Sequence, residues 1–440
     1  MEHSYLPNFS YLFIPFTTAN LEDFSAFCST ITQKTGWLPI ETDNRYLHRY
    51  VAERIVSRQS AADSQFQLDP QFAKAQGLFL GTKQYSTAPK LFGGQMNNGF
   101  QFQIADVKLF TFNTGICILA FELRFNDNDP IKIAAAQYSL RKISTEKIYT
   151  ADGNTAGESF VDISERILSN CTRNFALDFF FYATPKNEKA NFLTYVDVPK
   201  QDSYSKELYY LKWCYSDNFD YEDDRYSEDS IDYVANSCTV WGISVSAAAC
   251  LVYRSEKQKQ FIETVFQNNF RKQYLLTYVL LLHQKYMMYL LLTKLSVGLD
   301  GNLQQLKAYK ERLYHFETHY MFSYISEVPQ YQRFYGIVRK IFAIDQLFTD
   351  VQEPLTQLTE MQKQKAESKQ QSHDQRVSTA LATLSLLTIV SALTDASGIT
   401  ANLGWLISEP VSQIIQAVTL TLVLVTSIVM LIRLICSRKD

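Results

Sequence analysis

Two long apolar runs near the end of the chain dominate its pattern of apolar and polar positions. Residues 377–394 form an 18-residue run without a charge, and residues 411–432 form a 22-residue run without a charge. As helices these runs would be about 27 Å and about 33 Å long, which matches a membrane hydrocarbon core of about 30 Å. The pattern predicts a transmembrane hairpin, with helices at residues 377–394 and 411–435 and a connecting loop at residues 395–410.

A third apolar run, residues 274–295, has a different character. His283, Gln284 and Lys285 interrupt it at its centre. A lysine at the middle of a bilayer costs about 2.5–3.5 kcal/mol on insertion scales. We therefore expect this run to be a buried helix of a soluble domain.

The lysines and arginines predict the orientation of the hairpin. Residues 395–410 contain neither type, whereas basic residues flank both spans: Lys363, Lys365, Lys369, Arg376, Arg433, Arg438 and Lys439. Because basic residues favour the cytoplasmic side, we expect a multi-pass protein of the plasma membrane with cytoplasmic N- and C-termini. Residues 395–410 would be extracellular, and residues 436–440 would form a basic cytoplasmic tail. Residues 1–5 lack a basic stretch followed by an apolar one, so we expect no secretory signal.

Residues 1–253 have the pattern of a cytoplasmic α/β or α+β domain. Two alternating runs on either side of Asn113-Thr114-Gly115 predict a β-hairpin. Further strands are predicted for FLTYVDV, ELYYLKWCY and CTVWGISVSAAACLVY, and helices for residues 21–35 and 161–169.

The pattern becomes helical from about Glu256. We expect long helices at roughly 256–297, 302–325 and 328–350, within a helical cytoplasmic region at residues 254–353. A stalk helix at residues 354–376 would begin with Pro354 at its first position and continue into the first span, over about 60 Å in all. Its middle is polar all round, which suits a helix that bridges two anchored parts.

The composition agrees with a mainly water-soluble protein that is attached to a membrane. The 440 residues carry a formal net charge of −3 and are 14% aromatic, which allows a packed core. They lack the basic excess of nucleic-acid-binding proteins, so we expect no nucleic acid duplex as a partner. The seven cysteines are scattered without a C-x-x-C pair, which favours unpaired thiols in a reducing compartment.

The order of these parts resembles the CorA family of divalent-cation channels. Three stretches are similar to a divergent bacterial branch labelled CorA-like: WGISVSAAACLV from residue 241, YVLLLHQKYMMYLLL from residue 278 and FSYISEVPQYQRFYGIVRKIF from residue 322. The resemblance covers roughly Tyr204 to the C-terminus. It implies a homopentamer in the lipid bilayer, in which the first span lines a pore for a divalent cation such as Mg²⁺.

The chain departs from this family at the end of the first span. CorA channels carry Gly-Met-Asn there, whereas residues 391–398 are SALTDASG, and Met96-Asn97 lies far away in the soluble part. Two functions therefore stay open. The first is a homo-oligomeric cation channel or transporter with a cytoplasmic sensing domain. The second is a membrane-anchored sensor or effector whose cytoplasmic domain binds a small molecule, such as a nucleotide messenger.

Polar residues of the first span are the candidates for a pore lining. Ser385, Thr388, Ser391 and Asp395 are spaced so that a helix places them on one face. In a pore they would contact the water shell of a cation, and Mg²⁺ releases its water reluctantly. Without a pore, the hydroxyls would simply bond back to their own helix.

Asp395 is also the strongest candidate for the outer mouth of a pore. A carboxylate at the end of a span attracts cations. Asn402 and Glu409 are candidate companions, and the alternative for both is an ordinary solvated loop.

Two polar clusters in the soluble part could bind a metal ion or could be ordinary surface groups. Residues 216–232 hold eight acids and one arginine without EF-hand spacing, so they form either a low-affinity divalent-cation patch or a solvated acidic loop. His315 and His319 have the spacing of a zinc pair but no identified third ligand. Motifs for nucleotide binding, hydrolysis or Cys/His catalysis do not occur. We expect no enzymatic activity and no covalently bound cofactor.

Overall fold

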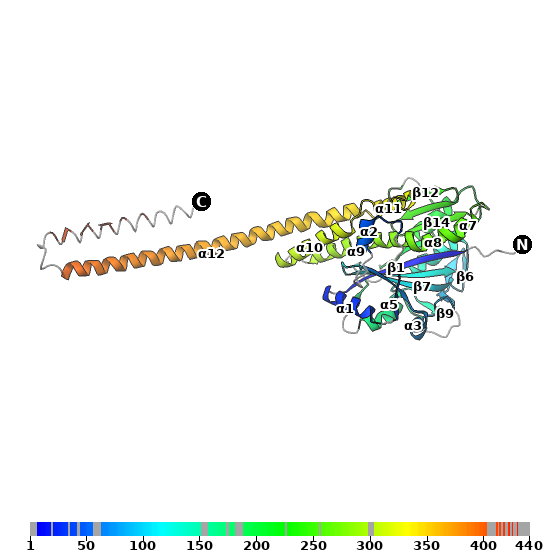
Figure 1. Cartoon of the computed structure of the whole chain (residues 1–440), viewed down its shortest axis with the longest axis horizontal. Helices are drawn as coiled ribbons and strands as arrows, with labels where there is room; N and C mark the ends of the chain where they lie inside the picture. Colours follow the sequence, from blue (N-terminus) through cyan, green and yellow to red (C-terminus); the bar gives the residue numbers. More distant parts are fainter. Residues whose placement is uncertain are drawn as a thin grey trace. The chain divides into compact units, whose positions relative to one another are not determined.

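A computed structural model describes most of the chain (Figure 1). The described residues are 7–402, except 19–20, 34–35, 42–44, 56–62, 151–156, 173–175, 180, 182–187, 225–226, 254, 256 and 298–302. Beyond residue 402 they are 411, 413, 414, 417, 418, 421, 422, 425 and 429. The chain divides into two compact units, Met1–Thr356 and Gln357–Asp440.

The first unit is built on a mixed sheet of twelve described strands. Nine of them follow the order β12-β13-β14-β11-β1-β8-β7-β3-β2, while β10 pairs with β1, and β4 pairs with β7 and β9. The pair β11 and β14 is parallel, and the other described pairs are antiparallel. A separate hairpin consists of β5 and β6.

The strand bounds are β1 Asn8–Thr18, β2 Trp37–Pro39, β3 Ser64–Leu68, β4 Tyr85–Thr87, β5 Lys90–Phe92, β6 Gln95–Asn97, β7 Gln101–Thr111, β8 Ile116–Phe125, β9 Ile148–Thr150, β10 Leu177–Asp178, β11 Asn191–Val198, β12 Ser230–Asn236, β13 Thr239–Ser244 and β14 Ala247–Tyr253.

The helix bounds are α1 Leu21–Ile31, α2 Arg49–Ile55, α3 Pro70–Ala75, α4 Pro130–Leu140, α5 Phe160–Leu168, α6 Ser205–Trp213, α7 Lys259–Phe261, α8 Gln267–Asn269, α9 Leu275–Val297, α10 Leu303–Tyr320, α11 Pro329–Ile341 and α12 Ile344–Asn402. Two π-helical turns, Ile262–Phe266 and Phe270–Tyr274, join α7, α8 and α9.

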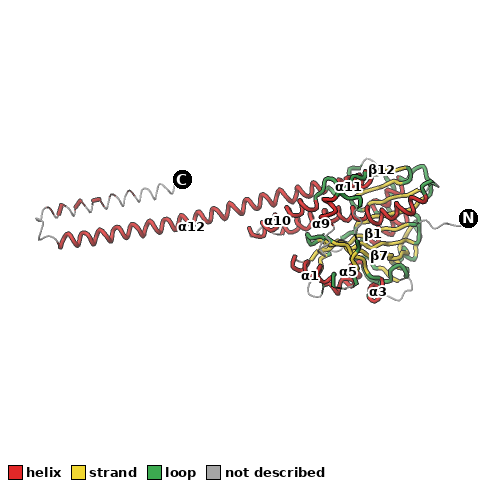
Figure 2. The backbone as a smooth tube through the Cα atoms, in the orientation of Figure 1, coloured by secondary structure: helices red, strands yellow, loops and turns green. Residues whose placement is uncertain are grey.

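Strand β1 lies at the centre of the sheet and is buried along its whole length. Its alternate residues point to opposite faces. Leu12, Ile14 and Phe16 belong to the core shared with α1, α4, α5 and α6. On the other face, Phe13 packs against Tyr278 of α9. The sheet thus has helices on both faces, which explains why β1 is an almost continuous apolar run (Figure 2).

Most strands predicted from the sequence are confirmed. The runs around Asn113-Thr114-Gly115 form the antiparallel pair β7 and β8, FLTYVDV forms β11, and CTVWGISVSAAACLVY forms β13 and β14. The prediction of a strand at ELYYLKWCY is wrong, because this segment forms α6. Its Leu208, Leu211 and Lys212 are buried at helical spacing, and the helix contacts β13 and β14. The packing outweighs the β-propensity of the aromatic residues.

The buried helix predicted at residues 274–295 is also confirmed. Among the described residues, the stretch Lys259–Ser296 is long and apolar enough to cross a membrane, but 89% of its most apolar window is buried inside the unit. His283, Gln284 and Lys285 are buried in this helix. The run is therefore the core helix of the first unit.

The helices after α10 differ from the predicted ones at their boundaries. The helix predicted at 328–350 is interrupted after Ile341, because Ala343 adopts a left-handed backbone with φ of 50°. The next helix, α12, begins at Ile344, so Pro354 lies inside it and not at its first position. α12 continues to Asn402, so the predicted loop does not begin at Asp395. Residues 395–402 contain no proline that would end the helix earlier.

Candidate functional site

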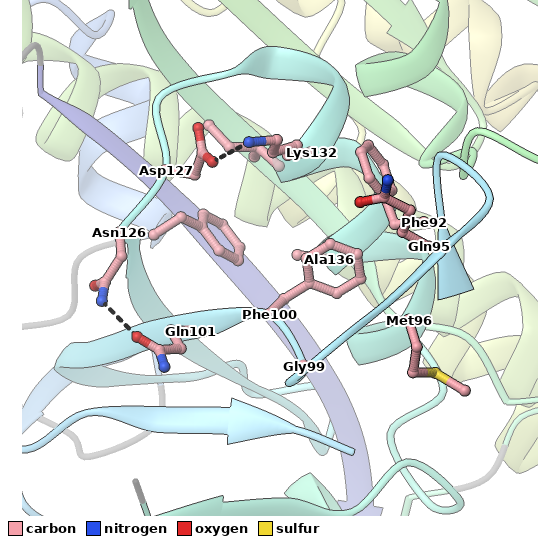
Figure 3. A pocket seen from close by; sticks show the side chains of 12 residues that line it. Phe92, Gln95, Met96, Gly99, Phe100, Gln101, Asn126, Asp127, Lys132 and Ala136 are labelled. Atoms are coloured by element: carbon pink, nitrogen blue, oxygen red, sulfur yellow. Dashed lines mark hydrogen bonds and ion pairs between the residues drawn. The ribbon is translucent and has the colours of Figure 1, made fainter. Parts of the chain in front are cut away.

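A cavity of about 430 Å³ opens on the first unit beside the β5–β6 hairpin (Figure 3). Two segments that lie apart in the sequence form its walls. The first runs from the hairpin into the start of β7, and the second runs from the end of β8 into α4. The lining residues are Phe92, Gln95, Met96, Gly99, Phe100, Gln101, Phe125, Asn126, Asp127, Lys132, Ile133 and Ala136.

Glycine is required where the chain enters this cavity. Gly99 has a φ of 92°, and a Cβ atom at this position would lie 2.1 Å from the carbonyl oxygen of Thr87. The backbone can therefore pass close to the end of β4 only without a side chain. This close approach positions Phe100, whose ring meets Phe92 of the hairpin edge-on at 5.9 Å between centroids.

The polar side chains of the cavity are one ion pair and the three carboxamides of Gln95, Gln101 and Asn126. Lys132 donates to Asp127 at 2.7 Å, and Asn126 donates to Gln101 at 3.2 Å. Burial acts to raise the pKa of Asp127, but the hydrogen bonds from Lys132 and from the Asp129 backbone outweigh it and lower that pKa. The cavity thus combines aromatic walls with balanced charge, which suits a small neutral or zwitterionic molecule.

The predicted pore-lining residues all lie on α12. Ser385, Thr388 and Ser391 are exposed. The hydroxyl of Ser385 donates to the carbonyl of Leu381 at 2.9 Å, and that of Thr388 donates to the carbonyl of Leu384 at 2.9 Å. These are the bonds within the helix that the sequence allows as the alternative to a pore. They use up the hydroxyl protons and leave the oxygens as acceptors.

The predicted outer-mouth residues are described less fully. The backbone at Asp395 and Asn402 is helical within α12, and their side chains lie outside the described part of the structure. Glu409 lies outside the described residues altogether. Their role at a pore mouth stays a prediction.

The described residues of both predicted spans are helical and largely exposed. On α12, the apolar side chains of Val377, Leu381 and Leu384 are 45%, 59% and 60% exposed. The described apolar residues of the second predicted span are exposed as well: Val411, Ile414, Val418, Leu422, Val425 and Val429. A row of large exposed aliphatic side chains requires cover by lipid or by another protein chain.

The acidic segment at residues 216–232 is held by a buried cation. The Lys212 ammonium, fully buried on α6, lies 2.8 Å from Asp224 and 2.8 Å from Asp232. Trp213 also donates to Asp224, at 2.6 Å. Two of the eight acids therefore anchor the segment to α6 and are engaged by Lys212.

Metal coordination finds no support in the described residues. They contain no group of three or more His, Cys, Asp or Glu side chains arranged to hold a metal ion. The His315 and His319 rings stack at 4.0 Å between centroids, and the His319 Nδ1 lies 2.9 Å from the His315 carbonyl oxygen. The spacing that resembles a zinc pair thus corresponds to a stacked pair on α10.

Sequence reasoning missed the cavity and the Lys212 cluster. The cavity is formed by segments whose proximity depends on the β5–β6 hairpin and the end of β8, and no local motif marks it. For Lys212, a usable signal existed: a lysine within an apolar aromatic run, followed by an acidic segment. Lysine is rarely buried unless it is paired with a carboxylate.

Comparison with known proteins adds little. No family model and no curated protein matches the chain. Among solved structures, a CorA magnesium transporter from Methanocaldococcus jannaschii matches with 13% sequence identity and a TM-score of 0.17, covering 54% of this chain and 90% of that chain. A likeness at this TM-score carries no argument about the fold or the function of this chain.

Proposed function

We propose that the chain is a CorA-like integral membrane protein that assembles into a homo-oligomeric cation channel with a cytoplasmic sensing domain. The supporting observation is that the described residues of α12 within the predicted first span are largely exposed, both the large aliphatic side chains and the hydroxyl-bearing Ser385, Thr388 and Ser391. Each large aliphatic side chain left in water would forgo about 1.5–3 kcal/mol of burial free energy. Lipid and neighbouring copies would supply the missing cover.

The hydroxyl geometry favours a hydrated cation as the permeating species. Ser385 and Thr388 donate to the helix backbone, so their oxygens face outward as acceptors. The water shell of a cation presents hydrogen atoms outward, and acceptors are the groups that it needs. Mg²⁺ keeps its shell most firmly, so a pore with this lining suits Mg²⁺ without direct coordination. The cation is cargo, and the proposal includes no catalysed reaction.

Assembly is required because one hydroxyl-bearing face cannot form a pore by itself. Facing copies would enclose Ser385, Thr388 and Ser391 in a shared polar interior, away from lipid. Five copies are proposed by resemblance to the CorA family. Native mass measurement of the detergent-solubilised protein should give a closed ring of five, whereas a stable monomer would rule out the pore.

Asp395 provides the sharpest test of transport. Five carboxylates at one level would concentrate cations, so Asp395→Asn should reduce flux and Asp395→Lys should nearly abolish it. Asp374→Asn, on an exposed part of α12 before the predicted span, is the matched control and should not change flux. Each protein would be reconstituted in liposomes that contain a Mg²⁺-sensitive dye. Equal flux through the unaltered protein and the three variants would show that Asp395 does not lie at a pore entrance.

The cavity beside the β5–β6 hairpin favours a second function, a membrane-anchored sensor or effector. A ligand in that cavity would contact Gln101 and Asn126, both of which are exposed and can be replaced without disturbing the core. Small metabolites and nucleotides would be screened by thermal shift on the unaltered protein, on Gln101→Ala/Asn126→Ala, and on the control Gln260→Ala. This function predicts a compound that raises the melting temperature of the unaltered protein and of Gln260→Ala, but not of Gln101→Ala/Asn126→Ala. If the unaltered protein also conducts no cation under any gradient, the sensor becomes the better account.

A further inference from the structure

A second, smaller cavity of about 200 Å³ lies where the end of the β2–β3–β7 edge of the sheet meets the long core helix. Its lining includes three cations, Lys108 of β7 with Arg271 and Lys272 of the second π-helical turn. The carboxamides of Gln65 and Gln67 also line it. This cavity is separate from the one beside the β5–β6 hairpin and has no part in the proposed channel.

Arg271 is held in place from two sides. Its guanidinium carbon lies 3.8 Å from the centroid of the Phe9 ring, and its Nε lies 3.5 Å from the buried Glu122 carboxylate. The two terminal nitrogens have no hydrogen-bond partner among the described residues. A guanidinium fixed through Nε and its flat face presents these terminal nitrogens as a fork, the geometry that recognises carboxylate or phosphate.

The π-helical turn accounts for the placement of the cations. A π turn inserts an extra residue into a helix and is often found at functional sites. Here Arg271 and Lys272 lie in the turn, and Leu275 and Leu276, one helical turn later, line the same cavity. The cavity therefore has a cationic end and an apolar floor.

Two of the acidic residues of this region, Asp106 and Glu122, already accept hydrogen bonds or form ion pairs. Asp106 accepts hydrogen bonds from Gln67 at 3.0 Å and from the Val107 backbone at 2.8 Å, and Lys108 lies 3.6 Å away. Glu122 is buried behind Arg271 and also accepts from Tyr11 and Arg124. Glu41 is an exposed acid at the wall. Lys272 is exposed and has no described partner, which leaves it for a ligand.

We propose that this cavity binds a small oxyanion, a phosphate or a carboxylate, through the terminal nitrogens of Arg271 and the ammonium of Lys272. The apolar floor accommodates a short aliphatic body when the anion is a carboxylate. Inorganic phosphate and butyrate represent the two sources of the same chemistry.

Isothermal titration calorimetry on the full chain in non-ionic detergent tests the proposal, with phosphate and butyrate at constant ionic strength in chloride. At least one of the two anions should bind once per chain. Lys272→Gln changes an exposed side chain, so it should keep the fold and weaken binding about tenfold. Arg271→Gln should weaken binding by at least as much.

Arg124→Gln is the matched control. Arg124 contacts the same Glu122 carboxylate as Arg271 but does not line the cavity. This variant should bind the anion as tightly as the unaltered protein. The proposal is overturned if neither anion binds the unaltered protein at about 20 mM, a weak-affinity limit. It is equally overturned if Arg124→Gln weakens binding as much as Arg271→Gln, because the effect would then pass through Glu122.

Discussion

Lys285 occupies an environment that opposes its charge. It is buried in α9; the face of the Phe342 ring, whose centroid lies 4.6 Å from the ammonium, attracts the charge but does not offset the burial. Burial, together with the charge of Arg141, lowers the pKa of Lys285 to about 8, against an ordinary value of about 10.4. Below pH 8 the folded chain carries the full cost of the buried ammonium. Between the two pKa values the unfolded chain binds a proton that the folded chain lacks, so stability rises with pH.

Lys285→Met should therefore stabilise the first unit, and the gain should depend on pH. The side chain keeps its length and loses its charge, so the gain at pH 7 should be about 2–3 kcal/mol. Thermal unfolding of both proteins at pH 7 and at pH 9.5 measures the difference, which should shrink at the higher pH. A difference that is equal at both values would contradict the depressed pKa.

Lys212 is the opposite case, a buried lysine that is matched by carboxylates. Removing it would leave Asp224 and Asp232 without their counter-charge, so Lys212→Met should lower the free energy of unfolding by about 3–5 kcal/mol. The triple variant Lys212→Met/Asp224→Asn/Asp232→Asn removes the whole charge cluster and should recover part of that loss. Urea unfolding, followed by tryptophan fluorescence, compares them. If the single and triple variants are equally unstable, charge imbalance is not the cause.

The elements show which parts of the fold can be predicted from local pattern. The β7–β8 hairpin and β13–β14 have alternating or β-branched runs with turn signals, so their prediction succeeded. The prediction for the segment of α6 was wrong, because its aromatic residues favour a strand in isolation, whereas its contacts with the sheet favour a helix. The break between α11 and α12 was not predicted either, because an alanine gives no sequence signal that its backbone is left-handed.

The candidate sites also could be predicted only where the signal is local in the sequence. The hydroxyl residues of α12 could be found because helical spacing alone places them on one face. The smaller cavity proposed to bind an oxyanion could not be predicted, because Arg271 and Lys108 come together only through the pairing of distant strands and a π-helical turn. Long-range packing of this kind has no local counterpart in the sequence.

The apolar part of α12 makes a prediction at the scale of the element. A lysine in this span would have to be inserted into the bilayer with the helix, at a cost of about 2.5–3.5 kcal/mol near the middle of a span. Leu384→Lys should therefore reduce the share of protein recovered in the membrane fraction. Gln371→Lys, on the exposed polar part of the same helix, is the control and should leave that share unchanged. Equal recovery of both variants would indicate that residue 384 does not lie in the bilayer.

At the scale of the whole molecule, the open property is its topology. The described cysteines Cys28, Cys117, Cys171, Cys214, Cys238 and Cys250 are buried, so they should contribute little to surface labelling of the folded protein. The distribution of lysine and arginine predicts that Ser397 lies outside the cell and Ser437 inside. Cysteine variants at these two positions also carry Cys436→Ser, which removes the seventh cysteine next to Ser437, so that the introduced cysteines report directly on the hairpin.

Ser397→Cys should react with a membrane-impermeant maleimide in intact cells, and Ser437→Cys should not. Both variants should react after the cells are permeabilised, which shows that each thiol is chemically accessible. If residues 377–394 did not cross the bilayer, Ser397 would stay on the side of the stalk and its cysteine would be protected in intact cells. Labelling of Ser437→Cys but not of Ser397→Cys would invert the topology. A pore mouth at Asp395 would then face the cytoplasm, and the carboxylates would draw cations from the opposite side.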